Sequence, residues 1–281
     1  MSNPIGVDLG QGTDALAVLA FRGPDAARFL HGQLSADVEN LPSGASRLAG
    51  LHSAQGRAIA LLMLARTSPE DILAVLPREL IADVAALLRK HVFRAKVRIE
   101  EPPFHVIGAA ASADPHGSYA FAWGNRQLLL APAGRDLARS PDTTRWNLED
   151  VRQGLPQVYA ATREQFVAQM LNLDLLGAVS FDKGCYTGQE VIARAHYRGR
   201  VKRRLQRWLN ASGTAVKPGD TVHGPGRRSL SVVRAACAEG EQEVLAVGAF
   251  GVAADDPPAQ PDDATIVSVS GPLPLPYALP E

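Results

Sequence analysis

One segment, residues 181 to 194, constrains the backbone more than any other part of the chain. It reads Phe-Asp-Lys-Gly-Cys-Tyr-Thr-Gly-Gln-Glu-Val-Ile-Ala-Arg, with a glycine on each side of Cys185. Glycine adopts positive φ angles without a steric penalty and lets a ligand or another backbone approach closely. Thr187 followed three residues later by Glu190 matches a capping box, which predicts a helix start. The segment therefore predicts a tight turn that leads directly into a helix.

Cys185 stands just before this predicted helix and two residues after Lys183. A helix N-terminus and a nearby ammonium group both favour the thiolate, which is the form that attacks electrophiles and binds metals. The same residues also fit a turn in which the cysteine only fills a small pocket, because free cysteine is among the most buried residue types. Both interpretations stay open at this point. The second cysteine, Cys237, lies in an apolar strand pattern, so we expect Cys185 to be the more reactive thiol.

Hydrophobic periodicity mixes strands with helices along the whole chain. It predicts helices that begin at Gly23-Pro24-Asp25 and over residues 80–91. It predicts strands at 16–21, 57–65, 71–76, 96–100, 105–111, 127–131, 201–209, 229–237 and 244–252. Residues 133–144 are polar and contain proline and glycine, which is typical of a connection. Strands alone follow residue 200, so we expect a small barrel there, followed by a proline-rich tail from Asp255.

The overall composition excludes several classes of protein. Lysine plus arginine equals aspartate plus glutamate at 29 each, so no global field attracts nucleic acid or a membrane surface. The two cysteines provide no disulfide framework, which suits a reducing compartment. The longest apolar run, residues 58–65, is too short to cross a bilayer, and no leader pattern opens the sequence. We therefore expect a cytoplasmic protein that does not enter a membrane.

A local cluster of basic residues begins directly after the cysteine segment. Its members are Arg194, His196, Arg198, Arg200, Lys202, Arg203, Arg204 and Arg207. Such a cluster fits a phosphate, an RNA backbone or the acidic polyglutamate tail of a folate, but a solvated strand face is the commoner reason for it. The aromatic residues nearby, Tyr197 and Trp208, are too few for a base-stacking platform. We expect no direct binding of nucleic acid.

The segment from residue 181 to residue 194 resembles the signature of the YgfZ family of folate-binding proteins. That signature is a string of lysine, glycine, cysteine, tyrosine, threonine, glycine, glutamine and glutamate. Supporting matches lie in Gly23-Pro24-Asp25-Ala26 through Phe29-Leu30 to Gly32-Gln33, in Gln55-Gly56-Arg57 and in Gly154-Leu155-Pro156. The similarity weakens after residue 210. The family shares a superfamily with the T-protein, the aminomethyltransferase of the glycine cleavage system.

The resemblance implies an α+β fold like that of the T-protein, with mixed sheets and helices and a small C-terminal β-barrel. Residues 1–200 would form the T-protein-like folate-binding region, with room for two subdomains, and residues 201–281 the barrel and tail. The implied ligand is tetrahydrofolate or a one-carbon folate. The implied function is the assembly or repair of iron–sulfur enzymes, including tRNA-modifying enzymes, with iron–sulfur client or assembly proteins as partners.

The resemblance also assigns roles to individual residues. Cys185 would act as a nucleophile or as a transient ligand of an iron–sulfur cluster, with Lys183 favouring its thiolate. Other residues would shape the motif loop: Gly184, Tyr186, Thr187, Gly188, Gln189, Glu190 and Arg194. Candidates for folate binding are Gln153, Asn172 and Asp174.

The sequence departs from the T-protein at two positions. The T-protein has an aspartate in the strand after a glycine pair, whereas residues 55–61 here contain no carboxylate. The glutamate that anchors the pterin ring in the T-protein aligns with Gln153, which can hydrogen-bond but carries no charge. Both changes argue against aminomethyl transfer, so enzymatic turnover stays open. Two alternatives remain: a folate-dependent aminomethyl-type transferase, and a non-catalytic, folate-responsive adaptor with a structural Cys185.

Overall fold

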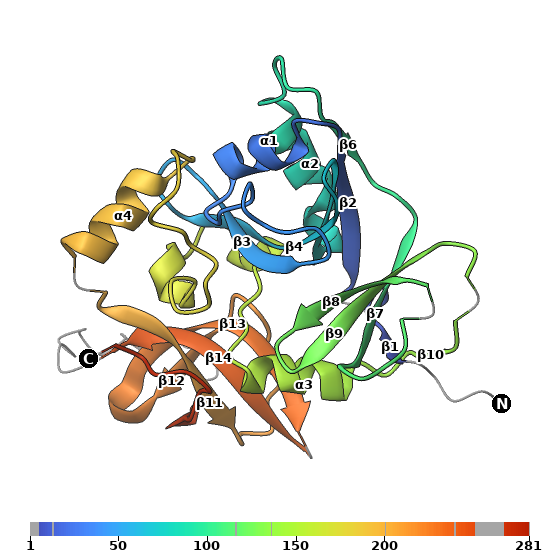
Figure 1. Cartoon of the computed structure of the whole chain (residues 1–281). Coiled ribbons are helices and arrows are strands. Elements are labelled where there is room, and N and C mark those ends of the chain that lie inside the picture. Colours follow the sequence, from blue (N-terminus) through green and yellow to red (C-terminus); the bar gives the residue numbers. More distant parts are fainter. Residues whose placement is uncertain are drawn as a thin grey trace.

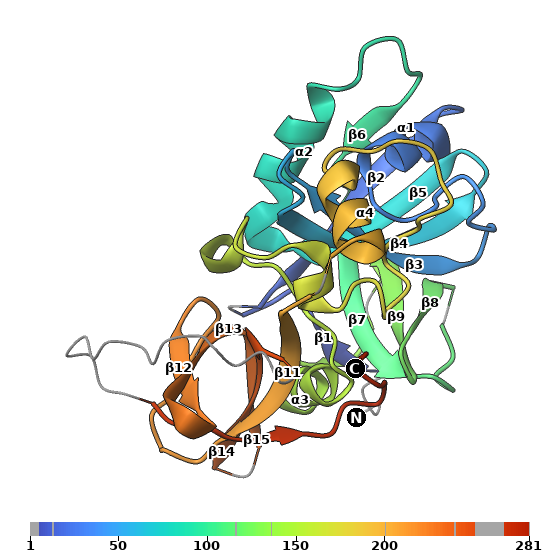
Figure 2. The same ribbon diagram turned by 90° about the vertical axis from the view of Figure 1, so that its left-hand side faces the viewer.

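Three five-stranded sheets make up most of the molecule, and short helices lie between and beside them (Figure 1, Figure 2). The computed structural model describes residues 6–12, 14–115, 117–135, 137–199, 201–238, 240–250 and 267–280. The predicted α+β class is confirmed. Arg200, and the tail from Asp255 as far as residue 266, lie outside the described residues.

The first sheet is antiparallel and has the strand order β3-β4-β5-β2-β6. Its strands are β2 (Leu16–Arg22), β3 (Ser46–His52), β4 (Ala58–Ser68), β5 (Asp71–Pro77) and β6 (Arg98–Glu100). The helices α1 (Ala26–Gln33) and α2 (Ile81–Arg89) pack on the face that carries Leu19 and Phe21. Val18 and Ala20 point to the other face, which packs on the second sheet. Burial on both faces explains why the strands β2, β4 and β5 are mainly apolar instead of alternating.

The second sheet has the order β10-β1-β7-β9-β8, and only its β1–β10 pair is parallel. Its strands are β1 (Gly6–Asp8), β7 (Phe104–Ala110), β8 (Tyr119–Trp123), β9 (Arg126–Pro132) and β10 (Arg139–Ser140). Val106, Leu128 and Leu130 face the first sheet. The predicted strands of the two sheets are confirmed, whereas β1, β3, β8 and β10 were not predicted, because their sequences are short or weakly alternating.

Helix α3 (Thr144–Arg152) joins the second sheet to the third through one buried carboxylate. Asp150 accepts hydrogen bonds from Trp123 Nε1 at 2.7 Å and from Arg126. It also pairs with Arg234 Nη2 of the third sheet at 2.7 Å. A buried carboxylate is tolerated only when its lone pairs are satisfied, so this group fixes the relative placement of the two sheets. Trp146, also on α3, is packed in the core.

The third sheet has the order β12-β13-β14-β11-β15 and curls into a half-barrel (Figure 2). Its strands are β11 (Arg203–Asn210), β12 (Thr221–Gly224), β13 (Arg228–Ala238), β14 (Glu241–Ala249) and β15 (Ser270–Leu273). One face forms a small core around Trp208 and Val222. The other face contributes Leu205, Val233 and Leu245 to the main core, across the domain boundary predicted at residue 200.

The segment between the second and third sheets holds α3, short 3₁₀ helices and α4 (Gln189–Tyr197). The 3₁₀ helices of the structure are η1 (Arg78–Leu80), η2 (Ala160–Thr162), η3 (Ala168–Leu171) and η4 (Pro225–Arg227). Within the residues that the structure describes, no helix has both the length and the apolar character that crossing a membrane requires.

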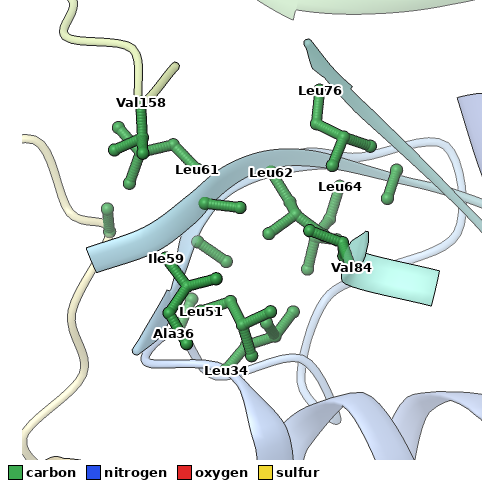
Figure 3. Close-up of a cluster of buried hydrophobic side chains, with 14 of the residues drawn as sticks. Leu34, Ala36, Leu51, Ile59, Leu61, Leu62, Leu64, Leu76, Val84 and Val158 are labelled. Atoms are coloured by element: carbon green, nitrogen blue, oxygen red, sulfur yellow. The ribbon is translucent and has the colours of Figure 1, made fainter. Parts of the chain in front are cut away.

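The main core contains one unusual polar side chain at the end of β3. In this core, Leu51, Ile59 and Leu61 pack with Leu34 and other apolar side chains (Figure 3). His52 is 1% exposed, and neither of its ring nitrogens has a hydrogen-bond partner of normal geometry. Burial disfavours the imidazolium form and lowers the pKa of His52 to about 4, and the neighbouring Gly56 backbone offsets this only in part.

We predict that His52 makes the fold acid-sensitive. The pKa of His52 in the folded state lies below its value in the unfolded state, so the folded state binds fewer protons. The stability that this group allows above about pH 6.5 is therefore lost as the pH falls towards 4. When the pH falls from about 7.5 to about 4.5, the free energy of unfolding measured in urea should decrease by about 2.5 kcal/mol more for the wild type than for His52→Leu. Parallel pH profiles for the two proteins would contradict this assignment.

Candidate functional site

The motif loop, residues 181–188, ends at a glycine that begins α4. Gly188 is the N-cap residue with φ +83°, and no side chain caps the helix. The predicted capping box of Thr187 and Glu190 is therefore wrong: the helix begins one residue later, at Gln189, and both side chains are exposed. The physical reason is a close backbone contact at Gly188, which requires the left-handed conformation.

That contact joins the motif loop to the turn between β3 and β4. A Cβ atom on Gly188 would lie 2.4 Å from Ser53 O and 2.9 Å from Gly56 Cα. Gly56 also has a positive φ, and a Cβ on it would lie 3.0 Å from Cβ of Val191 in α4. The two backbones touch because neither carries a side chain at this point. Two segments that carried the resemblance, residues 55–57 and the motif loop, are thus brought together.

Lys183 attaches the motif loop to the end of α1. Its Nζ donates to Leu34 O at 2.6 Å, to Ala36 O at 3.1 Å and to His31 O. These bonds use all three donors of the ammonium group and satisfy carbonyls at and beyond the helix end. Burial lowers the pKa of Lys183 to about 8, and the neighbouring carboxylates offset part of this effect. No hydrogen bond to the Cys185 thiol is found among the described residues, so an influence of Lys183 on that thiol stays a prediction.

Tyr186 holds the middle of the loop in the core. Its side chain is 7% exposed, and its ring centroid lies 4.9 Å from Lys183 Nζ. Burial raises the pKa of the Tyr186 hydroxyl to about 12, so the group stays neutral. Lysine and tyrosine therefore act together as the anchor of the loop.

His31 is a residue of this site that sequence reasoning missed. Its Nδ1 lies 3.2 Å from Asp37 Oδ1, and its Nε2 lies 3.7 Å from the position of a Cβ on Gly184. The ring therefore faces the residue before Cys185. The sequence contained no signal for this, because a lone histidine at the end of an amphipathic helix is commonly a surface residue.

Cys185 is exposed, which fits a reactive thiol better than a packing role. The expectation that the strand around Cys237 shields the second thiol is wrong, because Cys237 is exposed near the end of β13. Among the described residues, no three metal-ligating side chains gather at one place. A resident iron–sulfur cluster needs several thiolates and does not fit this site.

A cavity of about 750 Å³ lies beside the motif loop. It is lined by residues of β3, β4, β8 and the segments 155–156 and 176–182, among them Arg47, Met63, Trp123, Pro156, Val179 and Asp182. This volume is within the range of small-molecule sites. Because Cys185 follows Asp182 by three residues, the two Cα atoms are at most about 11 Å apart. The wall of the cavity and the exposed thiol thus belong to one short segment.

The three predicted folate residues fall into two places. Gln153 is next to the cavity, with Oε1 3.8 Å from the position of a Cβ on the lining residue Gly124. Asn172 and Asp174 lie elsewhere and bind Arg204 of β11. Nη1 of Arg204 donates to Asn172 Oδ1 at 3.2 Å and to Asp174 Oδ1 at 3.1 Å, and its Nη2 donates to Asp174 Oδ2 at 2.9 Å. They hold the third sheet against the site, and their role in folate binding stays a prediction.

The basic cluster is divided by the fold. Arg204 is 3% exposed and paired with Asp174, and Arg207 lies 3.6 Å from the Glu243 carboxylate. Arg194, Arg198 and Lys202 are exposed. His196 stacks on Phe181 with ring centroids 3.8 Å apart. The buried part of the cluster is therefore structural, and only the exposed part on and after α4 is available to an anionic ligand.

The arrangement of the three sheets is that of a known class. The chain aligns with the glycine cleavage system aminomethyltransferase T from Bartonella henselae with a TM-score of 0.65 and 14% identity, over 83% of this chain and 76% of that one. The protein therefore has the fold of the glycine cleavage T-protein, as predicted.

Sequence comparison identifies the family within that class. The chain is 30% identical over 304 aligned positions to tRNA-modifying protein YgfZ of Serratia proteamaculans, covering 94% of this chain and 91% of the relative. It is 31% identical over 236 positions to tRNA-modifying protein YgfZ of Yersinia pestis, covering 72% and 71%. No family model matches the chain. The chain belongs to the YgfZ family of tRNA-modifying proteins.

We predict that the contact at Gly188 is needed for stability. Gly188→Ala should cost about 2–4 kcal/mol, because it combines an unfavourable φ with a clash against a backbone oxygen. Gly213→Ala is the matched control, since Gly213 also has a positive φ but has open space around it, and should cost about 1 kcal/mol. Urea unfolding measures both. Equal losses would show that the close approach is not important.

Proposed function

We propose that this protein binds tetrahydrofolate or a one-carbon folate in the 750 Å³ cavity and uses the Cys185 thiol to support assembly or repair of iron–sulfur enzymes in the cytoplasm. tRNA-modifying enzymes would be among the clients. The observation that carries the proposal is the placement of an exposed thiol at the end of a segment that also lines the cavity. The relatives are named tRNA-modifying proteins and the structural neighbour is an aminomethyltransferase, and both agree with this chemistry.

The lining of the cavity suits a folate. Trp123, Leu48 and Met63 provide apolar surface for a flat ring. Arg47 provides a cation for an anionic glutamate tail. Gln153, beside Gly124, can offer an amide to a pterin edge. When bound, the folate would supply one-carbon chemistry, and the protein would supply binding and orientation.

Cys185 would act as a thiolate close to the wall of the cavity. A thiolate can attack an electrophilic carbon or occupy one position on a cluster that is in transit. Since one cysteine cannot hold a cluster alone, the cluster would be cargo, with its other ligands provided by the client or assembly protein. Lys183 and Tyr186 keep the loop in place, and the remaining motif residues continue it into α4.

A folate-dependent aminomethyl-type transferase is the second candidate. The segment 55–61 has no carboxylate, but Asp182 provides one on the cavity wall. A carboxylate there could stabilise a cationic one-carbon unit. The adaptor alternative requires a structural Cys185, and an exposed thiol is a poor fit to that role.

We predict that tetrahydrofolate binds in the cavity. Calorimetry under anaerobic conditions should detect binding to the wild type, whereas Ser180→Trp, which fills the cavity, should weaken it at least about 10-fold, or about 1.4 kcal/mol. Ser229→Trp adds the same side chain at an exposed position of β13 and should bind as the wild type does. No detectable heat at millimolar folate, or equal binding by both variants, would reject this site.

We predict that Cys185→Ser abolishes rescue of iron–sulfur enzyme activity in cells that lack the native gene, while the melting temperature stays within about 2 °C. The thiol is exposed, so the exchange removes sulfur chemistry without opening a cavity. Cys237→Ser removes the other exposed thiol and should rescue fully.

A companion variant separates anchoring from chemistry. Lys183→Met leaves the carbonyls of His31, Leu34 and Ala36 without their donor and should cost about 1–3 kcal/mol of stability together with part of the rescue.

Full rescue by Cys185→Ser would make the cysteine structural and favour the adaptor.

A further inference from the structure

The loop between α2 and β6, residues 90–97, projects from the end of the molecule formed by α1, α2 and the first sheet (Figure 1, Figure 2). It presents Phe93, which is 87% exposed and is the most exposed large hydrophobic side chain among the described residues. The backbone of the loop is ordered by turns, with Val92 N donating to Arg89 O and Phe93 N donating to His91 O, both at 3.1 Å. The ring is therefore held in solvent by a defined loop.

The stretch of chain that carries this exposed ring is basic. Residues 84–99 contain five lysine or arginine residues and no aspartate or glutamate, in a chain whose charges balance overall. Two of the five have protein partners: Arg89 donates to Ile99 O at 2.9 Å, and Arg98 lies 3.6 Å from Glu100. The other three, Lys90, Arg94 and Lys96, are exposed, and no ion pair involves them in the described part of the chain. A single exposed aromatic is ordinary, but one inside a patch of unpaired cations marks a recognition surface.

The base of the loop is attached to the beginning of α1. Lys96 N donates to Asp25 Oδ2 at 2.7 Å, and a Cβ on Gly23 would lie 2.2 Å from Lys96 O. The other end of α1 receives the ammonium group of Lys183. Because α1 has 8 residues, the loop and the motif are separated by about 12 Å of helix. One short helix therefore connects the base of the loop with the attachment point of the motif that carries Cys185.

We propose that residues 90–96 dock an acidic protein partner, which takes Phe93 into an apolar pocket and places carboxylates against Lys90, Arg94 and Lys96. This inference rests on the proposed function, since the docked partner would be the iron–sulfur client or assembly protein that Cys185 serves. An apolar anchor surrounded by charges is the usual composition of a protein hot spot, in which the charges steer the encounter and the ring provides most of the affinity.

The surface fits a protein better than RNA or a membrane. RNA binding of this kind uses several aromatic side chains on which successive bases stack, and the loop offers only Phe93. The balanced charge of the whole chain gives no general attraction to polyanions. Stable attachment to a membrane requires a large amphipathic face or a lipid, and the loop supplies one ring.

The test begins with a photoreactive phenylalanine analogue at position 93 of the full chain in cells. The cross-linked protein is identified, purified and titrated against the wild type and its variants. Phe93→Ser should weaken binding at least about 30-fold, and Lys90→Glu/Arg94→Glu at least about 10-fold, with a marked loss at high salt. The melting temperature should stay within about 2 °C, because these side chains are exposed.

Matched controls make the same chemical changes elsewhere. Tyr119→Ser removes a 44% exposed aromatic from β8, and Arg227→Glu/Arg228→Glu reverses two exposed charges at the start of β13. Both should leave partner binding within about 2-fold. Photolabelling of tRNA or lipid instead of a protein, the absence of any protein cross-link, or unchanged binding by Phe93→Ser would each overturn the proposal.

The proposed function and the docking surface are tested independently of each other. Cys185→Ser should bind the purified partner as the wild type does and yet fail to rescue. If Cys185→Ser rescues fully while Phe93→Ser still loses the partner, the docking surface stands and the thiol chemistry does not. If Phe93→Ser binds the partner normally and rescues, the docking surface is wrong whatever Cys185 does.

Discussion

The contact between Gly188 and Gly56 controls the site, because it sets where the motif loop ends and where α4 begins. Two backbones meet at a distance that no side chain allows, and the helix start moves to the glycine that makes this possible. Lys183 attaches the other end of the loop to α1 by three hydrogen bonds to carbonyls. Between these two attachments Cys185 remains exposed, so the loop is rigidly placed while its thiol is accessible.

The same two attachments determine the wall of the cavity. Residues 176–182 lead from the buried Asn172–Arg204 network to the loop, and they line the cavity on the way. Arg204 and Asp150 are buried charges whose partners come from different sheets or segments. Because an unpaired buried charge is costly, each pair permits only one relative placement of the elements that it joins. The cavity and the thiol are therefore consequences of how the three sheets are assembled.

The sequence predicted the long strands and the two N-terminal helices because each has the hydrophobic period of its element. It did not predict β3, which is weakly alternating, or the shorter strands β8, β12 and β15. The cysteine segment pointed to the site, yet its local pattern suggested a threonine cap, whereas a tertiary contact placed the cap on glycine. Local capping rules fail here because a long-range backbone contact, and not the side chains of the cap, determines where the helix begins.

Sequence alone determined the α+β class and predicted a role for Lys183, Gly184 and Cys185, since the residue types and their spacing are local properties. Tertiary structure decided the rest. It turned Lys183 towards α1, set His31 beside Gly184, moved Asn172 and Asp174 into the contact with Arg204, and left Phe93 in solvent in a loop with the exposed cations Lys90, Arg94 and Lys96. Each of these outcomes depends on residues far apart in the chain, and the free energy of a buried or exposed group is set by neighbours that only folding brings together.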